Sequence, residues 1–130
     1  MTRTGLSPTL SRHRREPLVE VNPDTAASYG LADGGLARVA TAHGSSVFRV
    51  AVTPAQRRRD LFVPIHWTDR TSSGGRAGML PGDARDPVSG QPGFKNTPAT
   101  ITPYKPDWSG FLITRERPAE PDCAYWTMIR

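Results

Sequence analysis

Proline and glycine place the strongest constraint on how this 130-residue chain can fold. The sequence contains 13 prolines and 12 glycines, about one residue in five. Proline interrupts helices and cannot donate a hydrogen bond inside a sheet, while glycine favours turns. This composition argues against a helical bundle and predicts short elements joined by many turns. The length fits one domain.

The sequence also indicates the location of the protein, the state of its cysteine and the partners that its charge suits. No apolar run is long enough to span a membrane, and no apolar segment near Met1 resembles a secretory signal, so we expect a cytoplasmic protein. Cys123, the single cysteine, cannot form an internal disulfide and is expected to be a free thiol. The net charge of +5 comes mainly from arginine. The basic segment 1–15 suits nucleic acid, a phosphorylated cofactor or simple solvation.

Short strands are predicted wherever β-branched and apolar residues cluster between turn residues, at 18–21, 36–40, 47–52, 61–65 and 99–102. Asn22 is expected to cap a helix that runs from Pro23 to about Tyr29 and ends before Gly30. A tight turn at 43–45 predicts a β-hairpin. The order of elements favours a small, mostly β barrel with one or two short helices.

Two segments are expected to be irregular. Residues 67–86 carry no helix or strand pattern, and loops of this length inside a small domain are often functional or disordered. The Pro-rich end contains Trp108, Phe111, Tyr125 and Trp126, which we expect to find little core of their own to join.

Four segments carry a family resemblance: LVEVNPDTAA at 18–27, GLADG at 30–34, LFVPIHW at 61–67 and DPVSGQPGFK at 86–95. In this order they resemble the C-terminal molybdopterin-dinucleotide-binding domain of bacterial molybdenum oxidoreductases. Among these, the assimilatory nitrate reductase catalytic subunit is most similar, over roughly residues 1–117. The resemblance implies a double-psi β-barrel, the aspartate-decarboxylase-like barrel.

The resemblance also implies a division of the chain. Residues 1–16 correspond to the end of the family's cofactor loop and a basic arm, 17–103 to the barrel, and 104–130 to a Pro/aromatic-rich tail. Met1 falls in the middle of that cofactor loop, so we expect a fragment that lacks the first barrel strand, is marginally stable and binds the dinucleotide weakly. The iron–sulfur cluster and most of the active site would lie in other domains of the same oxidoreductase, whose substrate would be nitrate.

The implied cofactor is molybdopterin guanine dinucleotide with molybdenum, and neither a catalytic residue nor a metal ligand is expected in this chain. The cofactor-binding candidates are Lys95, Thr2, Arg3, Thr4, Gly78, Gln91 and Asn96. Lys95 matches a family lysine that contacts the dinucleotide; otherwise it is a plain surface lysine. Gly78 falls where many relatives have an asparagine, which leaves only a backbone contact. His66 is expected to face the substrate funnel, or else to pack on its neighbour.

Two other functions compete with this one. Gly44–Ser45 is a Gly-Ser bond of the kind that self-cleaves in pyruvoyl-forming decarboxylases of the same barrel class, although the surrounding motif is absent. A small basic nucleic-acid-binding β-barrel would instead use 1–15 and Arg57–Arg59 for phosphates. No aromatic residues interleave with those arginines to stack on bases, so we expect no nucleic-acid partner and no membrane partner.

Overall fold

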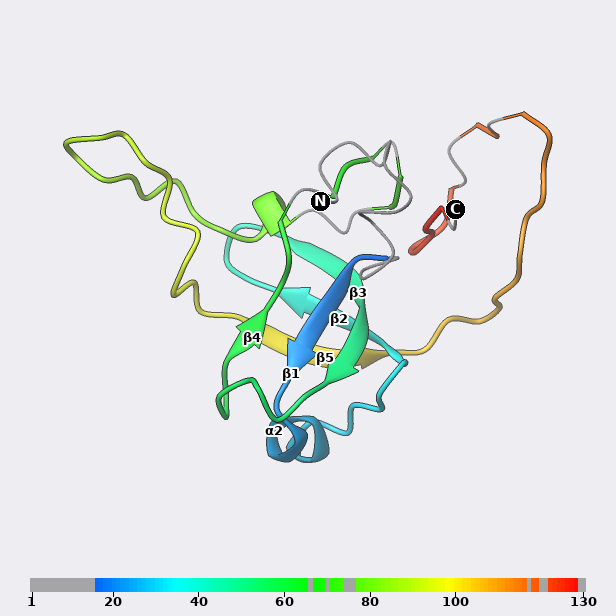
Figure 1. The fold of residues 1–130 in the computed structure, drawn as a ribbon, viewed down its shortest axis with the longest axis horizontal. Helices are drawn as coiled ribbons and strands as arrows, with labels where there is room; N and C mark the ends of the chain where they lie inside the picture. The colour runs from blue at the N-terminus through cyan, green and yellow to red at the C-terminus, as the bar shows by residue number, and fades with distance from the viewer. Residues whose placement is uncertain are drawn as a thin grey trace.

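The computed structural model describes residues 16–65, 67–69, 71–73, 77–116, 118–119 and 122–128. Within these ranges five strands form one curled sheet in the order β4-β1-β3-β2-β5 (Figure 1). Only β1 and β3 run parallel; the other neighbours are antiparallel. The elements are β1 (Leu18–Val21), α2 (Pro23–Ser28), β2 (Leu36–Ala40), β3 (Ser45–Val52), β4 (Leu61–Phe62), the 3₁₀ turn η1 (Ala77–Met79) and β5 (Thr100–Tyr104).

The core lies on one face of this sheet. Val19 and Val21 of β1 are fully buried and alternate with half-buried neighbours, as the two-residue period of a strand requires. Phe48 of β3 is the largest fully buried side chain. The other buried members of the cluster come from the helix, the loops and the remaining strands: Ala26, Leu31, Ala37, Val39, Val50, Leu80 and Ile101. A core of this size confirms a small, mostly β architecture.

Helix α2 begins and ends as the sequence predicts, to within one residue. The Asn22 side chain accepts a hydrogen bond from the Asp24 amide at 2.9 Å, which satisfies one of the free donors of the first turn. Gly30 adopts φ +65° directly after the helix. The Leu31 amide then donates to the Ala26 carbonyl at 2.9 Å. This pattern is a Schellman motif, which turns the chain back toward the sheet.

Three strands have boundaries that differ from prediction. β3 begins at Ser45, two residues early, because its first residues continue the hairpin ladder with β2. β5 extends to Tyr104, which therefore belongs to the sheet and not to the tail. β4 stops at Phe62, so the prediction of a strand to residue 65 was wrong. Pro64 has no N–H for the ladder, which accounts for the early end.

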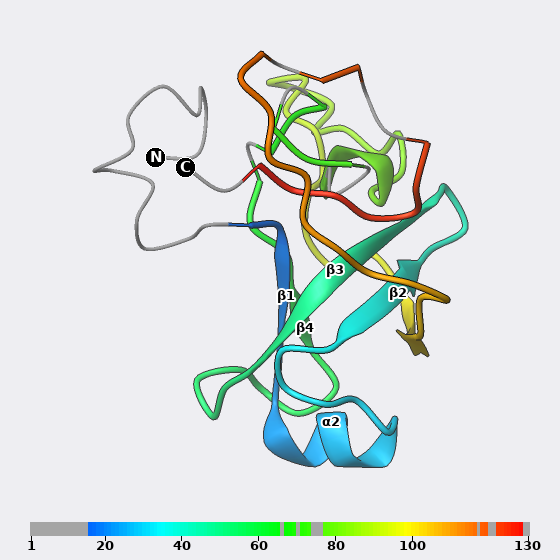
Figure 2. The ribbon, with the colours of Figure 1, turned by 90° about the vertical axis from the view of Figure 1, so that its right-hand side faces the viewer.

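The two ends of the sheet differ in character. Helix α2 lies at one end, and the long loops gather at the opposite end (Figure 2). Within residues 67–86 the chain forms η1, so the prediction of no helical element there was wrong. The curled sheet confirms a mostly β fold, whereas a double-psi barrel stays a prediction.

The C-terminal segment 125–128 packs against the loop that follows Trp67. Ser72 and Thr127 form an antiparallel bridge, and Ser72 is fully buried. The Trp126 amide donates to the Ser73 hydroxyl at 2.7 Å. Tyr125 and Trp126 are thus fixed by hydrogen bonds but stay half-buried and outside the hydrophobic core, so the prediction that the late aromatic residues find little core to join stays a prediction.

Candidate cofactor-binding site

Residues 84–93 form a projecting hairpin, which we call the arm. It extends from the sheet at the upper left of Figure 1. The Asp86 amide donates to the Gln91 carbonyl and the Gly93 amide to the Ala84 carbonyl, both at 2.9 Å. Gly90 closes the tip with φ +69°, a conformation that glycine adopts without strain. Every residue of the arm is exposed, so these local bonds determine its shape.

Asp86 organises the tip of the arm. Its Oδ1 accepts hydrogen bonds from the Ser89 amide at 2.7 Å, the Ser89 hydroxyl at 2.8 Å and the Val88 amide at 3.1 Å. The Ser89 amide, and then its hydroxyl and the Val88 amide, lower the pKa of Asp86. The carboxylate is therefore ionised at neutral pH and holds three donors on one oxygen.

Three of the predicted binding residues lie on or directly after the arm. Gln91, Lys95 and Asn96 are all exposed. Among the described residues, Lys95 forms no ion pair and its side chain has no hydrogen-bond partner. Asn96 adopts φ +61°, a left-handed conformation that asparagine tolerates better than most residues. The stretch presents one cation and two amides to solvent.

Gly78 lies in η1, at the same end of the sheet as the arm (Figures 1 and 2). A Cβ added at Gly78 would meet no atom within 4 Å, so the backbone here borders open space. Close contacts hold η1 in place. The Thr41 hydroxyl donates to the Leu80 carbonyl at 2.7 Å, and a Cβ on Gly44 would come within 2.5 Å of the Met79 carbonyl oxygen.

The role of Gly44 is one that the sequence did not reveal. The sequence predicted a tight turn there and, under a competing function, a self-cleaving Gly44–Ser45 bond. The structure shows in addition that the turn approaches η1 so closely that no side chain fits without a shift. This close approach could be predicted only by knowing that η1, which contains Gly78, lies opposite the turn. The residues around Gly44 do not indicate that.

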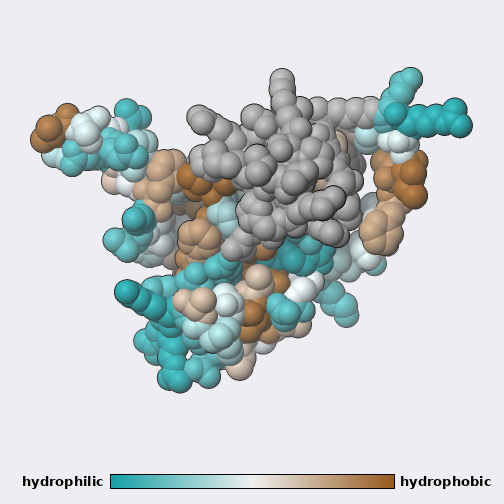
Figure 3. All heavy atoms as spheres, in the orientation of Figure 1, coloured by the Kyte–Doolittle hydropathy of each residue, from teal (hydrophilic) through white to brown (hydrophobic). Residues whose placement is uncertain are grey.

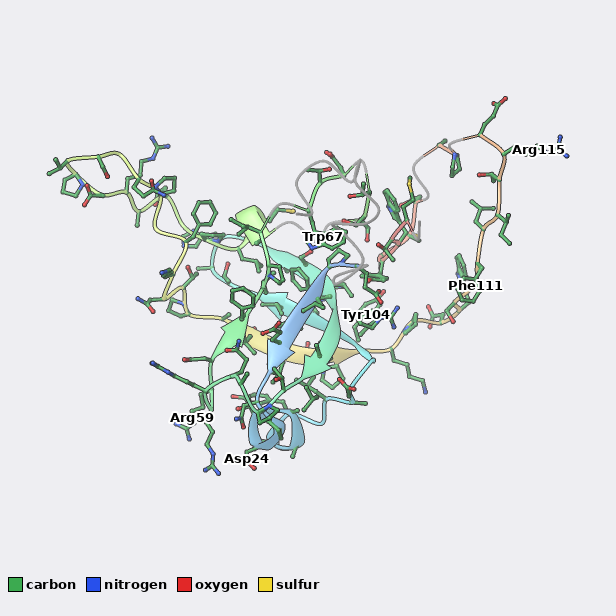
Figure 4. The ribbon with its side chains drawn as sticks, in the orientation of Figure 1. Asp24, Arg59, Trp67, Tyr104, Phe111 and Arg115 are labelled. Carbon is green, nitrogen blue, oxygen red and sulfur yellow. The ribbon has the colours of Figure 1, made fainter. Side chains whose placement is uncertain are left out.

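The remaining candidates are not placed. Thr2, Arg3, Thr4 and His66 lie outside the described residues. Trp67, next to His66 in sequence, is 8% exposed, and its Nε1 has no hydrogen-bond partner within the described ranges. Figure 4 shows Trp67 at the loop-rich end of the sheet.

The part of the chain that the structure describes contains neither a metal-binding group of side chains nor a membrane-spanning helix. No group of three or more His, Cys, Asp or Glu side chains is arranged to hold a metal ion. None of the helices in the part that the structure describes has the length and apolar character needed to cross a membrane.

Comparison with known proteins identifies the family. Residues 1–98 match the family described as "Molydopterin dinucleotide binding domain". The chain belongs to this family. It is 41% identical over 126 residues to a nitrate reductase of Klebsiella oxytoca, a match that covers 97% of this chain and 14% of the relative. It is 34% identical over 100 residues to the assimilatory nitrate reductase catalytic subunit of Bacillus subtilis, a match that covers 77% of this chain and 14% of that relative.

A solved structure supports the fold. Acetylene hydratase from Pelobacter acetylenicus superposes with a TM-score of 0.59 and 24% identity, over 72% of this chain and 15% of that one. At this identity the likeness concerns the fold alone. The chain thus spans about one seventh of the length of its nitrate reductase relatives. The family resemblance read from the four sequence segments is confirmed.

Proposed function

We propose that this chain binds the guanine dinucleotide part of a molybdenum bis-pterin cofactor, as the C-terminal domain of a nitrate-reductase-type oxidoreductase. The observation that carries the proposal is the 41% identity to a nitrate reductase along 97% of the chain, within a dinucleotide-binding family. The other domains of the enzyme are its partners, nitrate is the substrate of the whole enzyme, and the cytoplasm is its location. When bound, the molybdenum centre supplies oxygen-atom transfer.

The candidate binding residues that the structure describes fit the polar part of such a cofactor. A dinucleotide offers a pyrophosphate, which needs cations and N–H donors, and flat heterocycles, which need paired donors and acceptors. Lys95 offers an ammonium group that no described carboxylate neutralises. The exposed amides of Gln91 and Asn96 can each donate and accept. The open backbone at Gly78 lets a planar group approach closely.

The candidates outside the described residues have complementary roles in this proposal. The hydroxyls of Thr2 and Thr4 and the guanidinium of Arg3 suit phosphate oxygens. His66 would face the substrate funnel, where an imidazole can guide an anion or a proton. The chain itself binds and orients the cofactor and carries no catalytic residue.

The decisive experiment replaces Lys95 in a full-length nitrate-reductase-type enzyme that carries this chain as its C-terminal domain. A hydrogen bond to a charged group contributes about 1.5–3 kcal/mol, so Lys95→Ala should weaken cofactor retention roughly 10- to 150-fold. Molybdenum per enzyme after dialysis is the measurement. The matched control is Lys105→Ala, because Lys105 is the only other lysine and is also exposed. Full molybdenum occupancy with unchanged activity in Lys95→Ala would refute the assignment.

His66 separates substrate guidance from cofactor binding. In the same enzyme, His66→Ala should change nitrate kinetics more than molybdenum content. Equal losses of molybdenum and activity would place His66 in folding or cofactor binding instead.

A further inference from the structure

A loop with several exposed apolar side chains projects from the sheet without covering any other element (Figure 1). Residues 105–116, which we call the strap, are exposed throughout. Trp108 is 75% exposed, Phe111 92% and Ile113 94%, and Leu112 between them is 69% exposed. In Figure 3 hydrophobic spheres project from the right-hand side of the molecule, and Figure 4 shows Phe111 on this segment, away from the sheet. Single exposed apolar residues are normal, whereas a contiguous group indicates an interaction surface.

The strap is not a frayed chain end, because elements on both sides of it are fixed. Before it, β5 pairs with β2 through Tyr104 and Leu36. After it, Tyr125 and Trp126 hydrogen-bond to Glu16 and Ser73. The orange segment in Figure 1 accordingly leaves the sheet, bulges outward and returns. The exposed side chains of the strap therefore belong to a loop that is attached to the rest of the structure at both ends.

The backbone of the strap is as unpartnered as its side chains. Among the described residues, positions 107–116 form no backbone hydrogen bond to another segment. Within the strap, the Thr114 hydroxyl donates to the Glu116 carbonyl at 2.6 Å. Phe111, Leu112 and Ile113 follow one another, so an extended chain points them to both faces. Aromatic and β-branched residues with free N–H and C=O groups are what strand addition to a sheet edge requires.

The comparisons show that a much longer relative shares the strap. The family match ends at residue 98, before the strap, but the match to the K. oxytoca nitrate reductase covers 126 of the 130 residues and therefore includes it. That relative has about seven times the length of the match. The strap is thus shared with a full-length enzyme beyond the dinucleotide-binding domain itself.

We propose that strap residues 110–114 dock as an extended strand into an apolar groove on the other domains of the full-length oxidoreductase. This inference rests on the proposed function in one respect only, namely that the chain acts as one domain of a larger enzyme. Phe111 and Ile113 fill pockets on one side of the added strand and Leu112 on the other. The strap thereby fixes the dinucleotide-binding domain against the rest of the molecule.

Hydrogen–deuterium exchange tests the proposal directly. The strap of this chain by itself should exchange at close to the rate of an unstructured peptide. In the full-length K. oxytoca enzyme, the aligned segment should exchange at least about 100-fold more slowly. Equal, fast exchange in both proteins would overturn the proposal.

A pair of variants tests it in this chain. Phe111→Ser with Ile113→Ser should leave the thermal midpoint of the 130-residue chain unchanged, and so should the control Val88→Ser, a 94% exposed residue of the arm. In the full-length enzyme carrying this chain, the double variant should speed proteolytic cleavage within the strap by at least about tenfold, whereas the control should not. A lowered midpoint of the isolated chain would show that the strap packs internally and would overturn the proposal.

Three further outcomes separate the alternatives. If the isolated chain forms a dimer that the double variant dissolves, the partner is a second copy and the proposal fails. If the strap is protected in the full-length enzyme but Lys95→Ala retains all its molybdenum, only the dinucleotide assignment fails. If molybdenum retention depends on Lys95 but the strap stays unprotected, only the strap proposal fails.

Discussion

The hydroxyl of Tyr125 donates to a Glu16 carboxylate oxygen, and the same oxygen accepts from Arg49 Nε at 3.1 Å. Arg49 also lies 5.5 Å from the centre of the Tyr125 ring and donates to the Gly34 carbonyl. This cluster joins the C-terminal segment to β3 and to the residues before β1. Tyr125→Phe removes one hydrogen bond from it and preserves the ring.

The expected loss follows from the exposure of the partners. A hydrogen bond to a charged group contributes about 1.5–3 kcal/mol when buried. The side chains of Glu16 and Arg49 are 28% and 36% exposed, so water compensates part of the loss. We expect Tyr125→Phe to lower the free energy of unfolding by about 1–2 kcal/mol and the thermal midpoint by about 3–8 °C.

The pH dependence gives a second, independent readout. Burial and then the hydrogen bond to Glu16 raise the pKa of Tyr125 above its ordinary value near 10. The folded state thus favours the neutral hydroxyl, and this contribution is complete below pH 10 and declines as the pH rises toward the folded pKa. The stability difference between the native chain and Tyr125→Phe should shrink by about 1.4 kcal/mol per pH unit above 10.

Urea denaturation with a double-mutant cycle checks the assignment. Tyr125→Phe and Glu16→Ala should show a coupling energy of at least about 1 kcal/mol. The control Tyr29→Phe, on a half-exposed side chain, should change stability by less than about 0.5 kcal/mol. A Tyr125→Phe variant as stable as this control, or with no coupling to Glu16, would refute the reasoning.

Three other perturbations have defined outcomes. Gly44→Ala should lower the free energy of unfolding in urea by about 1–3 kcal/mol, because its Cβ would lie 2.5 Å from a carbonyl oxygen of η1. Gly78→Ala faces open space and should be nearly neutral, so equal effects of the two variants would contradict this. Asn22→Ala should cost about 1–2 kcal/mol by thermal melting, because it loses the helix cap and a 2.8 Å bond to the loop before β4. The arm bonds to Asp86 should persist below pH 4 and weaken only as the pH falls through its lowered pKa; an NMR titration of the arm amides with a midpoint at or above pH 4 would be the contrary result.

Local rules were sufficient for most of the sheet. Asn22, Pro23 and Gly30 determine a helix through cap, first-turn and terminal positions that lie within eight residues of one another. Alternating valines likewise locate β1, and an apolar run broken only by Arg49 locates most of β3. The predicted boundaries were wrong where strand pairing determines how long a strand is. β4 ends early, shortly before a proline, and β5 continues as long as β2 offers partners.

Long-range contacts were beyond sequence reasoning. Arg49 interrupts an apolar run, and nothing nearby shows that Glu16 and Tyr125, 109 residues apart, meet beside it. In the candidate site, too, the features with a local sequence signal were predicted and those that depend on distant residues were not. Gln91, Lys95 and Asn96 came from one contiguous motif, which the structure keeps together on an exposed stretch. The fixing of η1 by the Gly44 turn depends on residues 35 positions apart and had no local signal.

We propose that Gln91 on the arm, with Lys95 and Asn96 directly after it, binds a guanine dinucleotide. The direct measurement is ¹⁵N NMR of the 130-residue chain titrated with guanosine diphosphate, which carries the guanosine and pyrophosphate of the cofactor, with cytidine diphosphate as control. We predict saturable shifts at Gln91, Lys95 and Asn96 that are larger with the guanine nucleotide, and none in α2. Shifts confined to Arg57–Arg59, equal for both nucleotides, or no shifts at all, would contradict the account.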